Sequence, residues 1–99
     1  MDKNGFVYIL FNEENGTLYT GSTYDIIMRV AQHKTKHFPN CFTAKYGVDK
    51  LGYWEECGSV ENAIMREKQI KSGNRNSKLK LIHSKNPDWI DLYDNLVRD

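Results

Sequence analysis

The apolar positions at the start of the chain follow a pattern typical of a β-hairpin. Residues 6–12 (FVYILFN) are apolar, aromatic and β-branched, which favours a strand. Residues 13–16 (EENG) supply turn residues, and residues 17–21 (TLYTG) form the returning strand. The pattern therefore predicts an antiparallel pair in which Tyr8 and Tyr19 lie close to opposite one another.

A helical repeat follows this hairpin. Ser22 stands three residues before Asp25, a spacing similar to a capping box, so Ser22 is expected to cap the helix. Pro39 must end it, because proline cannot continue the hydrogen-bonding of a helix. The buried face is marked by three apolar residues, Ile26, Ile27 and Val30.

The rest of the chain alternates between irregular and periodic segments. Residues 37–50 are irregular and aromatic, whereas residues 50–56 (KLGYWEE) predict a third strand. A helix over 60–71 is expected to be capped by Ser59 and closed by Gly73. The aromatic residues of the irregular segment are Phe38, Phe42 and Tyr46.

Two more helices are predicted near the end of the chain. Residues 77–85 (SKLKLIHSK) form one, and a short last helix is expected to start at Asn86 and Pro87. Its apolar side consists of Trp89, Leu92, Tyr93 and Leu96. The predicted order is β-β-α-β-α-α-α, an α+β fold with a small three-stranded antiparallel sheet flanked by helices.

Composition narrows the class of protein. The chain of 99 residues is 39% hydrophobic and 27% charged, which is typical of one globular domain over 1–99. No stretch approaches the roughly 20 apolar residues of a membrane span, and the start of the chain is unlike a signal peptide. We therefore expect a cytoplasmic protein with no membrane partner, whose two cysteines are free thiols.

The net charge of +1 conceals an uneven distribution. Residues 29–50 carry a charge of +4 and residues 66–85 a charge of +6, whereas the other segments are acidic. If the two basic blocks face the same way, they form a surface able to bind a polyanion. Two ordinary solvated helices account for the same pattern, so charge alone leaves both interpretations open.

Glu67 is the most informative single position. At 100° per residue it falls near the middle of the apolar stripe of its helix, not on the polar side. A buried carboxylate has to be paired, protonated or bound to a cation. The stripe itself consists of Val60, Ala63, Ile64 and Ile70. Either an ion pair or a functional carboxylate satisfies this requirement.

Arg29 and His33 are one helical turn apart at the edge of the first helix's apolar face. Arginine suits phosphate recognition, and histidine suits hydrogen bonding to phosphate or proton transfer. Together with Tyr8, Tyr19 and Glu67 they supply a proton acceptor, a charge stabiliser and a metal ligand. These are the components of a phosphodiester hydrolase.

These motifs, in this order, resemble the GIY-YIG nuclease superfamily. The resemblance starts with FVYIL, LYTG and STYDIIMRVAQHK, and continues through FTAKYGVDKLGYWEE, AIMREKQIK and NPDWIDL. It covers residues 5–92, and is strongest for short stand-alone members close to the nuclease domain of the excinuclease of excision repair. The first motif departs from the pattern at Phe6 and Val7, and the second at Thr20, without loss of a reacting group.

The resemblance implies a DNA endonuclease that uses one divalent ion, Mg²⁺ or Mn²⁺, in DNA repair or processing. It matches Tyr8 and Tyr19 to the motif tyrosines, and Gly21 to the glycine that lets the backbone turn beside the substrate. Glu67 corresponds to the only protein ligand of the metal. Arg29 and His33 match the functional positions of the first helix. A late asparagine that completes the site in many members has three candidates here, Asn74, Asn76 and Asn86.

The mechanism expected from this resemblance is attack by water assisted by Tyr8 or Tyr19. A tyrosine has a reference pKa of about 10, so a nearby cation is needed for it to act as a base at neutral pH. The products carry 5′-phosphate and 3′-hydroxyl ends. DNA shape or a protein partner is expected to supply specificity. The expected substrate-binding residues are Gly21, Lys34, Lys68, Lys71, Arg75 and Lys78.

Two other functions remain open from the sequence. One is a catalytically weak or inactive nucleic-acid-binding module with the same fold. The other is a small interaction domain that works through its aromatic residues. Salt dependence separates binding to DNA from docking to a protein, because only binding to DNA weakens steeply with salt. The sequence leaves the oligomeric state open.

Overall fold

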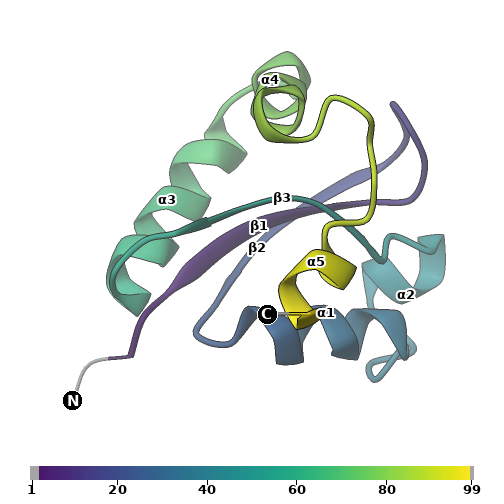
Figure 1. Ribbon diagram of the computed structural model, residues 1–99, viewed down its shortest axis with the longest axis horizontal. Coiled ribbons are helices and arrows are strands. Elements are labelled where there is room, and N and C mark those ends of the chain that lie inside the picture. The colour runs from purple at the N-terminus through teal and green to yellow at the C-terminus, as the bar shows by residue number, and fades with distance from the viewer. Residues whose placement is uncertain (1–2, 99) are drawn as a thin grey trace.

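The computed structural model describes residues 3–98, in which a three-stranded antiparallel sheet carries helices on both faces (Figure 1). The elements are β1 (Phe6–Phe11), β2 (Leu18–Thr23), α1 (Ile26–Lys34), α2 (Phe42–Tyr46), β3 (Lys50–Glu56), α3 (Val60–Ser72), α4 (Arg75–Lys85) and α5 (Tyr93–Arg98). The strand order is β2-β1-β3, so β1 is central and β2 is an edge strand. The predicted fold class is confirmed.

The pairing of β1 with β2 decides which residues share a face. Tyr8 pairs with Gly21, and Val7 pairs with Ser22. Tyr19 pairs with Leu10, so the two tyrosines are diagonal neighbours, close to opposite but not directly paired. Their ring centroids are nevertheless 6.4 Å apart, because diagonal side chains on one face of a sheet remain within reach.

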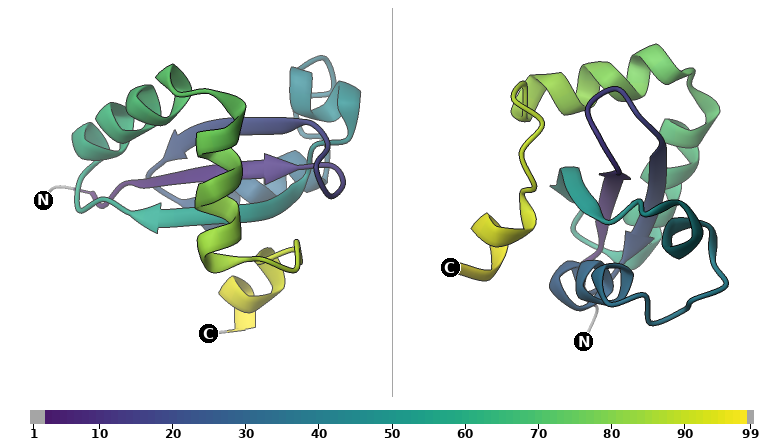
Figure 2. Two further views of the ribbon diagram at one scale, coloured as in Figure 1. Left: turned by 90° about the horizontal axis from the view of Figure 1, so that it is seen from above. Right: turned by 90° about the vertical axis from the view of Figure 1, so that its right-hand side faces the viewer.

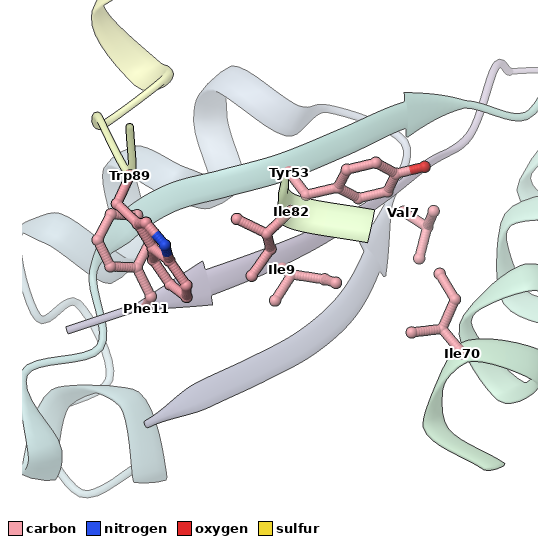
Figure 3. Close-up of a cluster of buried hydrophobic side chains, with 7 residues drawn as sticks. All are labelled: Val7, Ile9, Phe11, Tyr53, Ile70, Ile82 and Trp89. Atoms are coloured by element: carbon pink, nitrogen blue, oxygen red, sulfur yellow. The ribbon is translucent and has the colours of Figure 1, made fainter. Parts of the chain in front are cut away.

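Each face of the sheet has its own hydrophobic core. On the face covered by α3 and α4, alternate residues of β1 pack with Ile70 and Ile82, as Figure 3 shows. On the other face, Tyr8 and Leu10 pack with Ile26 and Val30 of α1, and α2 and α5 complete this layer (Figures 1 and 2). Among residues 3–98, no helix is both long and apolar enough to cross a bilayer.

The start and end of α1 differ from the prediction. Ser22 is not the N-cap, because β2 continues through Thr23 and Ser22 stays paired in the sheet. Asp25 caps the helix instead, and its carboxylate accepts a hydrogen bond from the Met28 amide at 3.0 Å. The helix ends at Lys34 with Thr35 as C-cap, before Pro39 is reached.

Two helices towards the C-terminus also begin elsewhere than expected. Asn74 accepts a hydrogen bond from the Ser77 amide at 2.9 Å, so α4 begins at Arg75, two residues earlier than predicted. α5 starts at Tyr93, not at Asn86.

The predicted order lacks helix α2, because five residues are too few to show a helical repeat in the sequence. By contrast, α3 has the predicted cap at Ser59 and ends at Gly73, although Ile64 of its predicted buried stripe is exposed.

Asn86 has a structural task that explains its burial. The register between β1 and β3 shifts after Ile9, which leaves Gly52 as an extra residue in β3. The side-chain amide of Asn86 donates to the Gly52 carbonyl at 3.2 Å and to the Ile90 carbonyl at 2.8 Å. Its oxygen accepts from the Ile90 amide at 3.0 Å. One buried side chain therefore ties the chain between α4 and α5 to the bulge.

We predict that Asn86→Ala lowers the free energy of unfolding by about 3 kcal/mol, because it leaves buried backbone groups without partners. Urea denaturation measures this loss. Asn76→Ala is the matched control, since Asn76 is exposed on α4 and its replacement should change stability by less than about 0.5 kcal/mol. Equal effects of the two substitutions would contradict the structural role of Asn86.

Candidate active site

Tyr8 is the buried centre of the candidate site. Its side chain is only 1% exposed, and its hydroxyl lies beneath the backbone of the edge strand. A Cβ atom at position 21 would lie 2.5 Å from the Tyr8 hydroxyl oxygen, so only glycine fits there. Gly21 thus lies inside β2, not at the turn after it, and makes room for Tyr8. Burial first, and then the neighbouring Tyr19, raise the pKa of Tyr8 above its ordinary value.

His33 connects Tyr8 to α2. One ring nitrogen, Nε2, lies 3.3 Å from the Tyr8 hydroxyl, and the other, Nδ1, lies 2.8 Å from Oγ1 of Thr43. Burial, followed by the positive charge of Arg29, lowers the pKa of His33 below its ordinary value. The imidazole is therefore neutral near pH 7 and serves as a hydrogen-bonding link between the sheet and α2.

Tyr19 and Arg29 face a cavity beside this link. The cavity has a volume of about 250 Å³. It is lined by Tyr19, Arg29, His33, Phe38, Cys41, Phe42 and Thr43. Nε of Arg29 is buried, and within residues 3–98 it has no hydrogen-bond partner. A buried guanidinium nitrogen without an acceptor is costly unless a ligand supplies one, and an oxyanion suits it best.

Glu67 approaches the same strand from the other side. It belongs to α3, which packs along β2 (Figure 2). One carboxylate oxygen accepts a hydrogen bond from the Ser22 hydroxyl, and the other pairs with Lys71 at 2.6 Å. The side chain is 20% exposed, so it is half-buried and paired with a cation, one of the arrangements expected from its position in the sequence.

The two groups of side chains meet around the edge of β2. Ser22 and Tyr19 point to opposite faces of the strand, since side chains alternate along it. After burial and the neighbouring Tyr19, the negative charge of Glu67 contributes to the raised pKa of Tyr8. The pKa of Lys71 is raised first by its hydrogen bond to Glu67. Tyr8, Tyr19, Arg29 and His33 thus lie together on one face of the sheet, and Glu67 reaches the same edge strand from the other face through Ser22.

The lysines and the arginine expected to bind substrate differ in their exposure and in the groups they contact. Lys68 is exposed on α3, near the paired Lys71. Arg75 donates to the Asn15 and Gly16 carbonyls of the β1–β2 turn, each at 2.6 Å, and Lys78 donates to the Gly73 carbonyl at 3.0 Å. Lys34 points away from the cavity and pairs with Asp91 next to α5.

Two groups at the site were not identified from the sequence. Ser22 resembles a helix cap, yet it binds the Glu67 carboxylate. Thr43 orients His33, although its neighbours in the sequence, Phe42 and Ala44, give no sign of this role. Of the three candidate asparagines, Asn74 caps α4, Asn76 is exposed and Asn86 holds the bulge of β3. None of them reaches the cavity lining.

Known proteins share both the sequence and the fold. The sequence model of the GIY-YIG catalytic domain matches residues 4–80. A solution NMR structure of a UPF0213 protein from Bacillus halodurans aligns with a TM-score of 0.54 and 28% identity, covering 89% of this chain and 92% of that chain. The chain therefore belongs to the GIY-YIG family, as its motifs indicate.

Relatives of similar length place it more narrowly. A UPF0213 protein of Syntrophus aciditrophicus is 38% identical over 88 residues, which is 89% of this chain and 98% of that protein. A UPF0213 protein of Staphylococcus epidermidis is 37% identical over 82 residues, covering 83% of this chain and 96% of its own length. The resemblance to small stand-alone GIY-YIG proteins is thus confirmed.

The lowered pKa of His33 predicts a pH effect on stability. The unfolded chain binds a proton at the ordinary pKa of about 6.5, whereas folded His33 binds it only at lower pH. Stability should therefore fall as the pH drops below about 6.5. We predict that His33→Gln reduces this loss, as measured by urea denaturation at pH 7.5 and 5.5. His37→Gln is the control, because His37 is exposed. An unchanged pH dependence in His33→Gln would refute the assignment.

Proposed function

We propose that this protein is a metal-dependent DNA endonuclease that hydrolyses phosphodiester bonds. The placement of Tyr19 and Arg29 on one side of the edge strand β2, and of Glu67 bonded to Ser22 on its other side, carries this proposal. Membership of the GIY-YIG family supports DNA as the substrate. We assign the activity to DNA repair or processing on the sequence resemblance to the nuclease domain of the excinuclease of excision repair.

The donor groups at Glu67 fit a hard divalent ion. They are a carboxylate and the Ser22 hydroxyl, both oxygen donors. Within the described part of the chain, no three His, Cys, Asp or Glu side chains cluster as metal ligands. Mg²⁺ and Mn²⁺ suit such a site, because ions of this kind accept one or two carboxylates and keep several waters. Bound at Glu67, the ion would neutralise charge on the scissile phosphate and on the departing oxygen.

Arg29 is the proposed phosphate ligand. Its Nε has no hydrogen-bond partner among the described residues, and its position on the cavity wall supports contact with a phosphate oxygen. The pentacoordinate transition state concentrates negative charge on these oxygens. A fixed guanidinium stabilises that charge more than it stabilises the ground state. His33 stays neutral and holds the neighbouring Tyr8 in place.

The structure favours Tyr19 over Tyr8 as the residue that handles the attacking water. Tyr8 is inaccessible, and its raised pKa, caused first by burial, keeps its hydroxyl protonated, so it is not available as a proton acceptor. Tyr19 lines the cavity together with Arg29, where a bound phosphate and its attacking water would lie. In the proposed reaction, the water oxygen bonds to phosphorus, and its proton passes to the hydroxyl oxygen of Tyr19 as that hydroxyl releases its own proton to solvent. The bond from phosphorus to the 3′ oxygen breaks, and solvent protonates that oxygen, leaving 5′-phosphate and 3′-hydroxyl ends.

The flanking cations would guide the DNA backbone to this centre. Lys68 and Lys71 lie on α3, and Lys78 lies on α4 beside a groove of about 580 Å³ next to the β1–β2 turn. Phosphates attract such cations regardless of base sequence, so we expect little sequence preference and a steep dependence of binding on salt.

A plasmid-nicking assay with Mg²⁺ or Mn²⁺ tests the proposal. We predict that Glu67→Gln abolishes cleavage, and that Tyr19→Phe lowers the rate by about 10²-fold or more. Tyr8→Phe is the matched control, because it removes the same hydroxyl from a buried position, and its rate should fall by less than that of Tyr19→Phe.

Cleavage by Glu67→Gln at the wild-type rate would overturn the mechanism. A wild-type protein that binds DNA but cuts no duplex, single-stranded or branched substrate would instead be a nucleic-acid-binding module. The same substitutions then identify which side chains bind.

A further inference from the structure

Three exposed aromatic rings next to the site have no part in the mechanism above. Phe38, Phe42 and Tyr46 are between 47% and 54% exposed. We call these three residues the aromatic patch. Single exposed apolar residues are normal, but a contiguous exposed group usually indicates a binding surface.

The aromatic patch is continuous with the active-site cavity. Phe38 and Phe42 line the cavity together with Tyr19 and Arg29. The ring of Phe42 stacks on that of Tyr19 with an interplanar angle of 27° and a centroid distance of 6.4 Å. Tyr46 extends the series outward, with its ring centroid 5.0 Å from that of Phe42. A flat ligand resting on these rings would therefore lie beside the group bound by Arg29.

The segment that carries the aromatic patch is anchored by other residues, so the exposed rings are not needed to hold it in place. The segment is held by Thr43, which is buried and bonded to His33, and by Val48, which is fully buried. The Val48 amide donates to the Thr43 carbonyl at 2.9 Å, and Gly47 takes the left-handed conformation that ends α2. The anchoring residues face inward, whereas the rings of the patch face solvent.

The charges around the patch match a nucleic acid. Lys36 and Lys45 are exposed on the same segment, and Asp49 is partly neutralised by Lys50 at 3.7 Å. Cations interleaved with exposed rings are typical of proteins that bind single strands, where rings stack on bases and cations contact phosphates. In an intact duplex the bases are already stacked on one another, so rings on a protein surface cannot reach their faces.

We propose that the aromatic patch stacks unpaired bases next to the scissile phosphate, so that the substrate is DNA with a single-stranded stretch at the cleavage point. This rests on the proposed function for its choice of ligand. The cavity is below the roughly 300–1,000 Å³ of pockets that enclose whole small molecules. The cavity is of a size to hold one phosphate at Arg29, and the neighbouring bases would stack outside it on the aromatic patch.

Fluorescence anisotropy with EDTA present tests the proposal, because removing divalent ions prevents cleavage during the measurement. Three labelled probes of equal length are compared at one salt concentration: a single strand, the same strand with abasic sites throughout, and a duplex closed at both ends. The wild-type protein should bind the single strand at least tenfold more tightly than the abasic strand. It should also bind the single strand more tightly than the duplex.

Substitutions then test whether the patch causes the difference. Phe38→Leu and Phe42→Leu keep apolar volume but remove the ring, and each should weaken single-strand binding by roughly fivefold or more. Binding of the abasic strand should not change, which separates loss of stacking from loss of the fold. Tyr24→Leu is the matched control, since Tyr24 is exposed outside the patch at the start of α1.

Equal affinity for the single and abasic strands, or single-strand binding unaffected by both leucine substitutions, would overturn the proposal. Failure of the proposed function has a different signature. A protein that binds single strands through these rings, yet cuts nothing when Mg²⁺ or Mn²⁺ is added, would keep the stacking site and lose the nuclease assignment. Absence of binding to all three probes would overturn both.

Discussion

The buried hydroxyl of Tyr8 is the constraint on which the site depends. A hydroxyl inside a hydrophobic layer needs a hydrogen-bond partner, and His33 is placed to provide one at 3.3 Å. His33 in turn fixes α2 through Thr43. Gly21 is needed so that the tyrosine fits beneath the edge strand. One polar chain thus fixes the positions of β1, β2, α1 and α2 relative to one another.

This arrangement gives different roles to two tyrosines that the sequence alone does not distinguish. Tyr8 is buried in the interior, whereas Tyr19 lies on the cavity wall with Arg29, whose Nε has no hydrogen-bond partner within the described part of the chain. Glu67 approaches β2 from the opposite face, on α3. After burial and the neighbouring Tyr19, its charge still contributes to the raised pKa of Tyr8. An edge strand is the place in a sheet where side chains from both faces come close together, which accounts for the location of the site.

The main elements and the position of Glu67 were predictable, because they follow from local rules. A run of apolar, aromatic and β-branched residues followed by turn residues defines the hairpin, and helical spacing places a carboxylate among apolar residues. The role of Ser22 was not predictable, since a serine after a strand resembles a cap and only the packing of α3 reveals its partner. Asn86 was also misread, because its task depends on a bulge in β3 that has no sequence signature of its own.

The central claim is that one divalent ion binds at Glu67, at the edge of β2. Paramagnetic broadening by Mn²⁺ in the amide NMR spectrum of the uniformly labelled protein tests it most directly, because it requires neither a DNA substrate nor turnover. Mn²⁺ should broaden the signals of residues 19–22 and 66–68 in the wild-type protein and leave them sharp in Glu67→Gln. Broadening of the same signals in Glu67→Gln, or broadening confined to other acidic segments, would contradict the account.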